Sequence, residues 1–306
     1  MCKLGVLIGV GLLAVTLSAG VVVAEAFLHP PRKALGAGAR DAAEQLAQSQ
    51  GASLEDAQIA AADGVPLRAW FFRAAAPSGN AVILLHGVAD NRASALGFAR
   101  LFLARQYDVL AIDSRAHGDS SGALATYGLL EVDDLHRWAD WLTKDRGERR
   151  LFALGESMGA GILLQALRDD TRFAAVAAES PFSSLREVAY DRLAAKLGCG
   201  PWLGRTLLRP IVENGFLYAR LRYGLRLGQI SPAAAVASTR VPILLIHGAE
   251  DRNIPPAHSR RILAAARGHA DLWIVPGAGH TAAYARSPAE FERRVTAWFA
   301  AAHPIQ

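Results

Sequence analysis

Short, uninterrupted runs of apolar residues alternate along the chain with longer stretches in which apolar residues recur every three or four positions. The short runs are typical of strands buried on both faces of a sheet, and the longer stretches of amphipathic helices packed on it. Runs of strand length occupy residues 81–85, 108–112, 151–154, 174–178, 241–246 and 271–275. Helical spacing occupies residues 94–105, 127–143, 160–167, 256–267 and 288–302. The alternation predicts an α/β fold with a mostly parallel central sheet flanked by helices.

Two stretches depart from this alternation. Residues 57–61 and 67–72 are apolar runs separated by Asp63-Gly64, a strong hairpin signal, so they predict antiparallel strands at one edge of the sheet. From Pro181 to Pro232 the sequence has no strand-like run, and short helical patterns, aromatic residues and many arginines occur instead. The second stretch predicts a helical cap at about residues 181–232, inserted over the C-terminal edge of the sheet.

The longest apolar stretch is at the N-terminus. Residues 4–24 carry no charge, and a run of about 20 apolar residues can cross a bilayer as a helix. Small residues in Val22-Val23-Ala24 and Ala24-Glu25-Ala26 also suit cleavage by a signal peptidase. Residues 1–28 are therefore either an uncleaved transmembrane anchor, which their length favours, or a signal peptide. Residues 29–52 are predicted to be a tether, and residues 53–302 the globular domain.

Basic residues occur on both sides of the apolar stretch, so their distribution does not fix the membrane topology. We expect the domain to be exported behind a single N-terminal membrane anchor, on the periplasmic or extracellular side. The alternative is a protein secreted after cleavage of a signal peptide.

Composition narrows the class of protein. Of 306 residues, 52% are hydrophobic and 20% charged, which allows a large core and excludes a disordered chain. The net charge of +5 and the lack of a basic block argue against nucleic-acid binding. Cys2 and Cys199 are the two cysteines, and with Cys2 in the N-terminal stretch neither a disulfide nor a cysteine-based metal site is expected. No zinc-protease or phosphate-loop motif is present, so no metal or cofactor is predicted.

Candidate chemistry begins at Gly155-Glu156-Ser157-Met158-Gly159, which lies between a predicted strand and a predicted helix. A serine hydroxyl needs a base and an exposed position to act as a nucleophile. A sharp strand-to-helix turn provides that position, and its glycines allow close packing. The start of the following helix also offers partial positive charge to a developing oxyanion. The pattern therefore predicts Ser157 as a catalytic nucleophile.

A base and an acid are expected downstream, in the order acid and then histidine. Of the downstream histidines, His280 follows a strand in the glycine-rich loop Pro276-Gly277-Ala278-Gly279-His280, where a loop-borne base should lie. We prefer it to the rest, which end a strand, lie on or near a helix or belong to the tail: His247, His258, His269 and His303. For the acid we prefer Asp251, which follows a strand, to Glu250 and Asp271.

The oxyanion of a tetrahedral intermediate needs two hydrogen-bond donors. The backbone N–H of Met158, directly after the nucleophile, is the first candidate. The second is the backbone N–H of Val88 in the loop after residue 85, where His86 is expected to brace the turn. No side chain is needed for either role.

In chain order, the motifs resemble those of the α/β-hydrolase superfamily, and most closely its serine-aminopeptidase-like and monoacylglycerol-lipase-like branch. They are His86-Gly87, Asp113-Ser114-Arg115-Ala116-His117-Gly118-Asp119-Ser120, Gly155-Glu156-Ser157-Met158-Gly159, His247-Gly248-Ala249-Glu250-Asp251 and Gly279-His280. The resemblance covers residues 53–302. It implies an α/β-hydrolase fold, a Ser157–His280–Asp251 triad, a cofactor-free mechanism and a cap, with Arg115 and His117 holding a loop.

Three functions are consistent with this pattern. The first is a serine hydrolase that cleaves carboxylic esters, including acyl lipids or thioesters. The apolar, arginine-bearing cap and the membrane segment favour this function. The second is a serine aminopeptidase, which would need an acid such as Glu187, Asp191 or Glu213 of the cap to hold the substrate's amino group. The third is a membrane-anchored scaffold without catalysis, which the complete triad makes the weakest.

Overall fold

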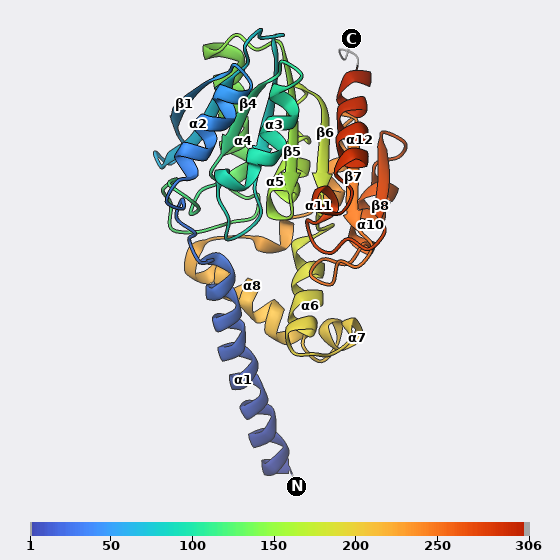
Figure 1. Ribbon diagram of the computed structural model, residues 1–306. Helices are drawn as coiled ribbons and strands as arrows, with labels where there is room; N and C mark the ends of the chain where they lie inside the picture. The colour runs from blue at the N-terminus through green and yellow to red at the C-terminus, as the bar shows by residue number, and fades with distance from the viewer. Residues whose placement is uncertain (1, 303–306) are drawn as a thin grey trace.

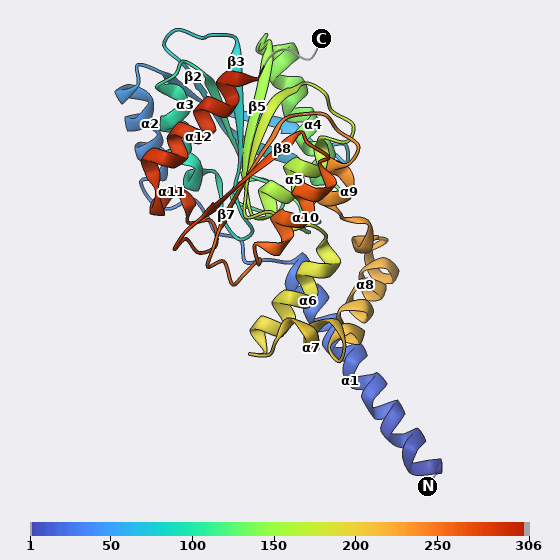
Figure 2. The ribbon, with the colours of Figure 1, turned by 90° about the vertical axis from the view of Figure 1, so that its right-hand side faces the viewer.

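The computed structural model describes the backbone of residues 2–302 and the side chains of residues 11–302. Its centre is an eight-stranded sheet in the order β1-β2-β4-β3-β5-β6-β7-β8 (Figures 1 and 2). Strands β1, β2 and β4 pair antiparallel, and all other neighbours are parallel. The strands are β1 (Ser53–Ala60), β2 (Pro66–Arg73), β3 (Asn80–Leu85), β4 (Asp108–Ile112), β5 (Arg150–Glu156), β6 (Phe173–Glu179), β7 (Ile243–Gly248) and β8 (Ala270–Val275). The mostly parallel sheet and its antiparallel edge confirm the fold prediction.

Helices cover both faces of the sheet because the central strands are apolar on both sides. In β3, Ile83 and Leu85 belong to one hydrophobic core, and Val82 and Leu84 to the other. The helices on the first face are α4 (Glu131–Asp140), α5 (Met158–Ala166), α9 (Pro232–Val236) and α10 (Ala257–Ala265). Those on the second are α2 (Ala39–Ser49), α3 (Leu96–Leu103), α11 (Ala283–Arg286) and α12 (Pro288–Ala301). Each strand therefore contributes to two cores, which explains its continuous apolar run.

The first hairpin follows its turn signal. Gly64 has φ +79°, a conformation that favours glycine, and the N–H of Gly64 donates to the carbonyl of Ala61 at 2.9 Å. Strands β1 and β2 pair in register from Ser53 with Arg73 to Ala60 with Pro66.

One helix is shorter than its pattern predicts. Periodicity extends from residue 127, but α4 begins at Glu131. Tyr127 and Gly128 have positive φ values of 55° and 122° and cannot start a helix. The buried carboxylate of Glu131 instead accepts hydrogen bonds from the N–H groups of Thr126 and Gly128, at 2.6 and 2.7 Å. Residues Trp141–Asp145 continue α4 as a π-helical turn.

The segment between the N-terminal helix and the sheet lies against the domain. Ala43 and Ala47 of α2 are buried in the second core. Upstream, the side chain of Asn91 donates to the carbonyls of Lys33 and Ala34 at 3.1 and 3.2 Å. Residues 29–52 are thus attached to the domain at these points, although most of them are exposed and the division into a tether and a domain stays a prediction.

Between residues 181 and 232, all of which the structure describes, there are helices and turns and no strand, while the bounds of the cap stay a prediction. This segment contains α6 (Leu185–Lys196), α7 (Pro201–Arg205), α8 (Arg209–Tyr223) and the 3-10 turn Leu227–Gln229, and α9 leads back to the sheet. Helix α1 (Cys2–Leu28) runs beside α8 and projects away from the body of the molecule (Figures 1 and 2). By length and composition α1 can cross a membrane, as an anchor or as a signal peptide.

Candidate active site

Ser157 lies on a strained turn between β5 and α5. Its backbone has φ +50° and ψ −109°, a region that non-glycine residues rarely adopt. The two glycines of the motif allow this turn to pack closely. A Cβ at Gly159 would lie 2.5 Å from the carbonyl oxygen of Leu85, and one at Gly155 would lie 2.7 Å from the carbonyl carbon of Gly159. The local geometry is that of the predicted nucleophile turn.

Gly159→Ala is expected to lower the free energy of unfolding by about 1–3 kcal/mol, because the new methyl group meets backbone that cannot rotate away. Gly36→Ala is the matched control, since a Cβ at Gly36 meets nothing within 4 Å. Urea unfolding of both variants measures the difference. Equal midpoints would contradict the packing argument.

The structure brings Ser157, His280 and Asp251 into one hydrogen-bonded line. His280 Nε2 lies 2.9 Å from Ser157 Oγ, and His280 Nδ1 lies 2.7 Å from Asp251 Oδ2. Asp251 lies in the turn after β7 and His280 in the loop after β8, both at the carboxyl ends of parallel strands. In the tautomer that suits this line, Nδ1–H donates to Asp251 and Nε2 accepts the proton of Ser157.

The carboxylate of Asp251 is buried and well supplied with donors. Oδ1 accepts from the N–H groups of Asn253 and Ile254, at 2.9 and 2.8 Å. His247 Nε2 lies 3.3 Å from Oδ2. Burial acts to raise the pKa of Asp251, but the hydrogen bonds from His247, His280 and the Ile254 N–H outweigh it and hold the pKa well below its usual range. Asp251 therefore stays ionised and can orient His280.

The rival histidines lie elsewhere. His247 is fully buried, with Nε2 donating to the Ile254 carbonyl at 2.8 Å and Nδ1 2.7 Å from Ser259 Oγ. His269 directly precedes β8, at the end of the strand opposite to His280. His303 lies outside the described residues. The rival acids Glu250 and Asp271 have exposed side chains.

His258 belongs to a second serine–histidine–aspartate cluster that the sequence did not reveal. Its Nδ1 lies 2.8 Å from Ser183 Oγ, and its Nε2 lies 3.2 Å from Asp191 Oδ2. All three residues are buried, and none lines a described cavity beside Ser157. The cluster joins the start of the cap to α10 and stabilises the fold there.

Two cavities meet at Ser157. An open pocket of about 410 Å³ is bordered by polar and aromatic groups that include Asp90, Glu156, Asn253 and Tyr284. A much narrower, mostly apolar cavity lies under the cap. It is bordered by Arg192 and otherwise lined in part by Phe27, Val88, Tyr127, Met158, Phe182 and Ile254. Val88 and Met158, the predicted oxyanion donors, both border the apolar cavity next to Ser157. Their role as donors stays a prediction.

Two carboxyl groups beside the nucleophile were missed from the sequence. Glu156 and Glu179 are paired neighbours at the ends of β5 and β6. Burial, and then the charge of Glu179, raises the pKa of Glu156 to about 8. Burial raises the pKa of Glu179 to about 7. The N–H of Ala283, which donates to Glu179 Oε1 at 2.8 Å, acts in the opposite direction and lowers this pKa. An acidic residue at the end of a buried apolar strand is the signal that marks both.

Glu179→Gln is expected to change the pH dependence of stability. A carboxyl group whose pKa is higher in the folded state than in the unfolded state destabilises the fold as the pH rises. For Glu179 the loss of stability begins near the unfolded-state pKa of 4.5 and is complete above the folded-state pKa of about 7. The full effect corresponds to roughly 3 kcal/mol, and the uncharged amide removes it. The melting temperature of the variant should therefore fall less than that of the wild type between pH 5 and pH 8. If the melting temperatures of the variant and the wild type fell by the same amount between pH 5 and pH 8, Glu179 would not titrate in this range.

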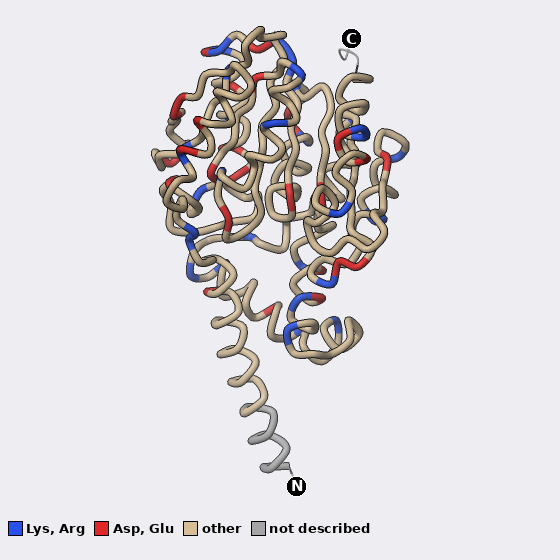
Figure 3. Tube along the Cα trace, viewed as in Figure 1, with Lys and Arg blue, Asp and Glu red and all other residues tan. Residues whose placement is uncertain are grey.

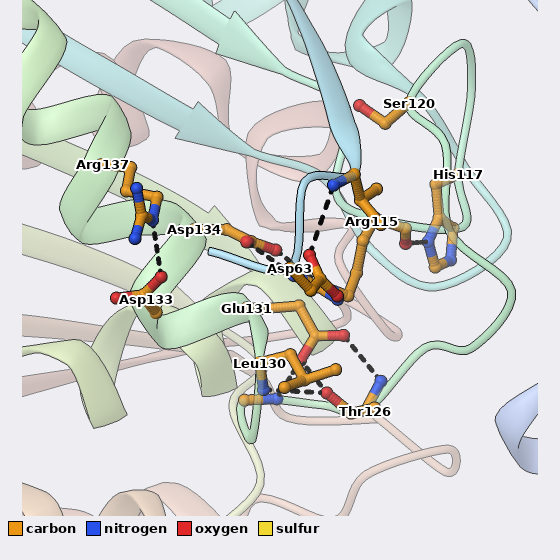
Figure 4. Close-up of polar contacts among 12 residues, drawn as sticks. Asp63, Arg115, His117, Ser120, Thr126, Leu130, Glu131, Asp133, Asp134 and Arg137 are labelled. Carbon is orange, nitrogen blue, oxygen red and sulfur yellow. Dashed lines mark hydrogen bonds and ion pairs between the residues drawn. The ribbon is translucent and has the colours of Figure 1, made fainter. Parts of the chain in front are cut away.

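The loop after β4 is held by buried ion pairs, and Figure 4 shows one of them. The Arg115 guanidinium donates to both carboxylate oxygens of Asp134 at 2.7 Å, and to Asp63 at 3.0 Å. His117 Nδ1 lies 2.9 Å from the carbonyl of Arg115. His86 Nε2 accepts the N–H of Ser114 at 3.1 Å, which links this loop to the turn that carries Val88. These residues support the site without reaching Ser157.

The fold and the nucleophile turn define an α/β hydrolase. The chain belongs to the alpha/beta hydrolase family, whose sequence model matches residues 82–294. A relative of uncharacterised function, YqkD from Bacillus subtilis (strain 168), is 31% identical over 221 residues, which cover 71% of this chain and 70% of YqkD. A monoacylglycerol lipase from Mycolicibacterium smegmatis is 28% identical, over 65% of this chain and 80% of the lipase.

Solved structures show the same fold. The Pyrococcus furiosus esterase Pf2001 superposes with a TM-score of 0.71 at 23% identity, covering 90% of this chain and 97% of the esterase. A puromycin-hydrolyzing peptidase from Mycobacterium tuberculosis superposes with a TM-score of 0.65 at 19% identity, covering 84% of this chain and 40% of the peptidase. The family and the lipase-named relative support a hydrolytic protein, and leave the substrate open.

Proposed function

We propose that this protein is a serine hydrolase that cleaves carboxylic esters, with Ser157 as nucleophile, His280 as base and Asp251 as the acid that orients it. The observation that carries the proposal is the line of hydrogen bonds from Asp251 through His280 to Ser157. The serine sits on a strained turn with its base 2.9 Å away, so His280, oriented by Asp251, can take the proton of the attacking hydroxyl.

The reaction runs through an acyl-enzyme. Ser157 Oγ attacks the carbonyl carbon of the ester while His280 Nε2 takes its proton, and the N–H groups of Val88 and Met158 stabilise the oxyanion. The bond to the alcohol breaks, and His280 gives its proton to the departing oxygen. Water then attacks the acyl group, His280 takes a proton from that water, and Ser157 recovers its own as the carboxylic acid leaves.

The two cavities suggest how a substrate lies. The apolar cavity suits an acyl chain, and the open polar pocket suits the alcohol. Exposed large apolar side chains of the described residues gather on α1 and the cap, with Leu130 as the exception. Those of the cap are Leu197, Trp202, Leu207, Leu217 and Leu221, with Trp202 71% and Leu221 76% exposed. Such a surface suits contact with lipid, and it favours acyl lipids, or thioesters with acyl chains, as substrates.

Membrane anchoring is part of this proposal. Helix α1 as a single N-terminal anchor would hold an exported domain, periplasmic or extracellular, at the surface from which its substrate comes. Secretion after cleavage of a signal peptide is the alternative.

The aminopeptidase alternative is weaker. The cap acids considered for holding a substrate's amino group have partners already. Glu187 accepts from Ser183 and Arg261, Asp191 pairs with Arg205, and Glu213 pairs with Arg186 and accepts from Tyr190. In the open pocket, Asp90 pairs with Lys33 at 2.8 Å, and a pKa of about 8 leaves Glu156 mostly uncharged at pH 7. These pairings leave few charged acids for a substrate ammonium group.

A two-part experiment tests the function. Fluorophosphonate labelling of the full-length protein should modify Ser157, and p-nitrophenyl acyl esters should be hydrolysed in preference to aminoacyl-nitroanilides. Preference for the anilides would instead establish the peptidase. An absence of labelling and of hydrolysis would favour the non-catalytic scaffold.

A further inference from the structure

Helix α1 has one buried stripe. Between residues 11 and 28 the fully buried positions are Gly20, Ala24 and Leu28, spaced four apart, and Thr16 is half-buried one turn earlier. A spacing of four places these residues on one face of a helix. Residues 11–15 on the preceding turns are exposed. The C-terminal half of α1 is therefore a packed element of the protein.

The buried stripe crosses α8 at backbone contact distance. A Cβ at Gly20 would lie 2.8 Å from the carbonyl oxygen of Ile211 and from the nitrogen of Gly215. A Cβ at Gly215 would lie 2.9 Å from the carbonyl oxygen of Gly20, with Ala24 Cβ 3.6 Å away. Small residues four apart are the usual means by which two helices approach this closely. Ala24, which both possible cleavage sites contain, therefore has a packing role.

Polar contacts join the same two helices. Glu25 accepts hydrogen bonds from the hydroxyls of Tyr218 and Tyr223, at 2.6 and 2.7 Å. Near the other end of the contact, the side-chain amide of Asn214 donates to Thr16 Oγ1 at 3.3 Å. Together these contacts fix α1 along the cap.

The last turn of α1 reaches the site. Phe27 lines the apolar cavity beside Ser157 and stacks on Tyr127, with ring centroids 3.9 Å apart. The Tyr127 hydroxyl donates to the Phe27 carbonyl at 3.0 Å, and the N–H of Ala125 donates to the Leu28 carbonyl at 2.9 Å. The cavity holds about 10 Å³, so an acyl chain enters only if part of this wall moves.

We propose that α1 is retained in the mature protein as a wall of the acyl pocket, and that Phe27 determines which acyl chains fit. The specificity part rests on the proposed ester hydrolysis; the retention part does not. The anchor is then also a part of the active site.

The dimensions of α1 agree with this double role. Residues 2–19 of α1 are 18 residues, and at 1.5 Å per residue they span roughly 27 Å, close to the hydrocarbon thickness of a bilayer. From residue 11, where its side chains are described, α1 is uncharged until Glu25, near the cap, as Figure 3 shows. The half of α1 before Gly20 can therefore cross the membrane while the half from Gly20 onward stays with the cap at its surface.

The first experiment measures the N-terminus of the mature protein. Full-length chain with a C-terminal tag is purified from bacterial membranes, and its intact mass is determined. Retention predicts a chain that begins at residue 1 or 2. A chain that begins at Glu25 or Phe27 would overturn the proposal, whatever the activity of the protein.

The second experiment compares acyl-chain preference. Phe27→Ala should raise kcat/KM for p-nitrophenyl esters of long-chain acids over short-chain ones by about tenfold relative to wild type, because it removes a pocket wall. Phe27→Leu keeps most of the volume and should stay closer to wild type, which guards against a folding defect in the alanine variant. Val22→Ala is the matched control on α1, since Val22 is 67% exposed.

The outcomes separate the two proposals. Active Phe27→Ala protein with an unchanged chain-length profile would overturn the role of Phe27 and leave the hydrolase function intact. Loss of ester hydrolysis and of fluorophosphonate labelling in the wild type would instead overturn the hydrolase function and the specificity role that rests on it, while the measured N-terminus still decides whether α1 is retained.

Discussion

Ser157→Ala is expected to reduce kcat for ester hydrolysis by about 10⁴-fold or more, and to abolish fluorophosphonate labelling. The substitution removes the only atom in the hydrogen-bonded line that can form the acyl-enzyme, while His280 and Asp251 keep their own contact. Alanine adds no volume at the strained turn, so the melting temperature should change little. Ester hydrolysis rates, single-turnover acylation and circular dichroism measure these effects.

The chain offers a matched control in Ser183→Ala. Ser183 also contacts a histidine that contacts an aspartate, but it is buried and lines neither cavity at Ser157. This variant should keep its labelling and most of its activity, with a cost confined to stability. Loss of labelling in Ser183→Ala, with labelling intact in Ser157→Ala, would reverse the assignment of the nucleophile.

Signals that are local in the sequence predicted much of the fold and the core of the candidate site. The apolar runs of the central strands, the Asp63-Gly64 turn and the glycines around Ser157 each act within a few residues. His280 and Asp251 could be selected because the carboxyl ends of parallel strands meet at one edge of a sheet, so chain order fixes which loops converge. The structure brings these side chains within hydrogen-bonding distance, and their catalytic role is proposed.

Contacts between distant segments could not be predicted from the same signals. Phe27 reaches the site only because α1 crosses α8, almost 200 residues later in the chain, as the bond from Asn214 to Thr16 shows. The cluster of Ser183, His258 and Asp191 likewise depends on how the cap meets α10. Helix α4 begins later than its apolar pattern predicts, because the Glu131 carboxylate accepts hydrogen bonds from N–H groups of the preceding loop. Periodicity records which residues are apolar, but not what they pack against.

Asp251→Asn should lower kcat by about 10⁴-fold at neutral pH while the fold persists. The carboxylate now accepts the Nδ1 proton of His280 at 2.7 Å, which leaves Nε2 free to accept the proton of Ser157. An amide nitrogen in that place donates to Nδ1 and forces the proton onto Nε2, so the imidazole cannot act as a base. The amide oxygen can still accept from the N–H groups of Asn253 and Ile254, which preserves the turn.

Glu250→Gln tests the same turn without touching the base, because Glu250 is the adjacent acid and its side chain is exposed. It should keep near wild-type kcat, whereas Asp251→Asn loses activity although it still folds. The pH–rate profile adds a signature that a folding defect would not produce: hydroxide can partly replace the lost base, so the activity of Asp251→Asn should climb with pH where that of the wild type has levelled. Comparable losses in both variants would mean that the turn, and not the carboxylate facing His280, controls the reaction.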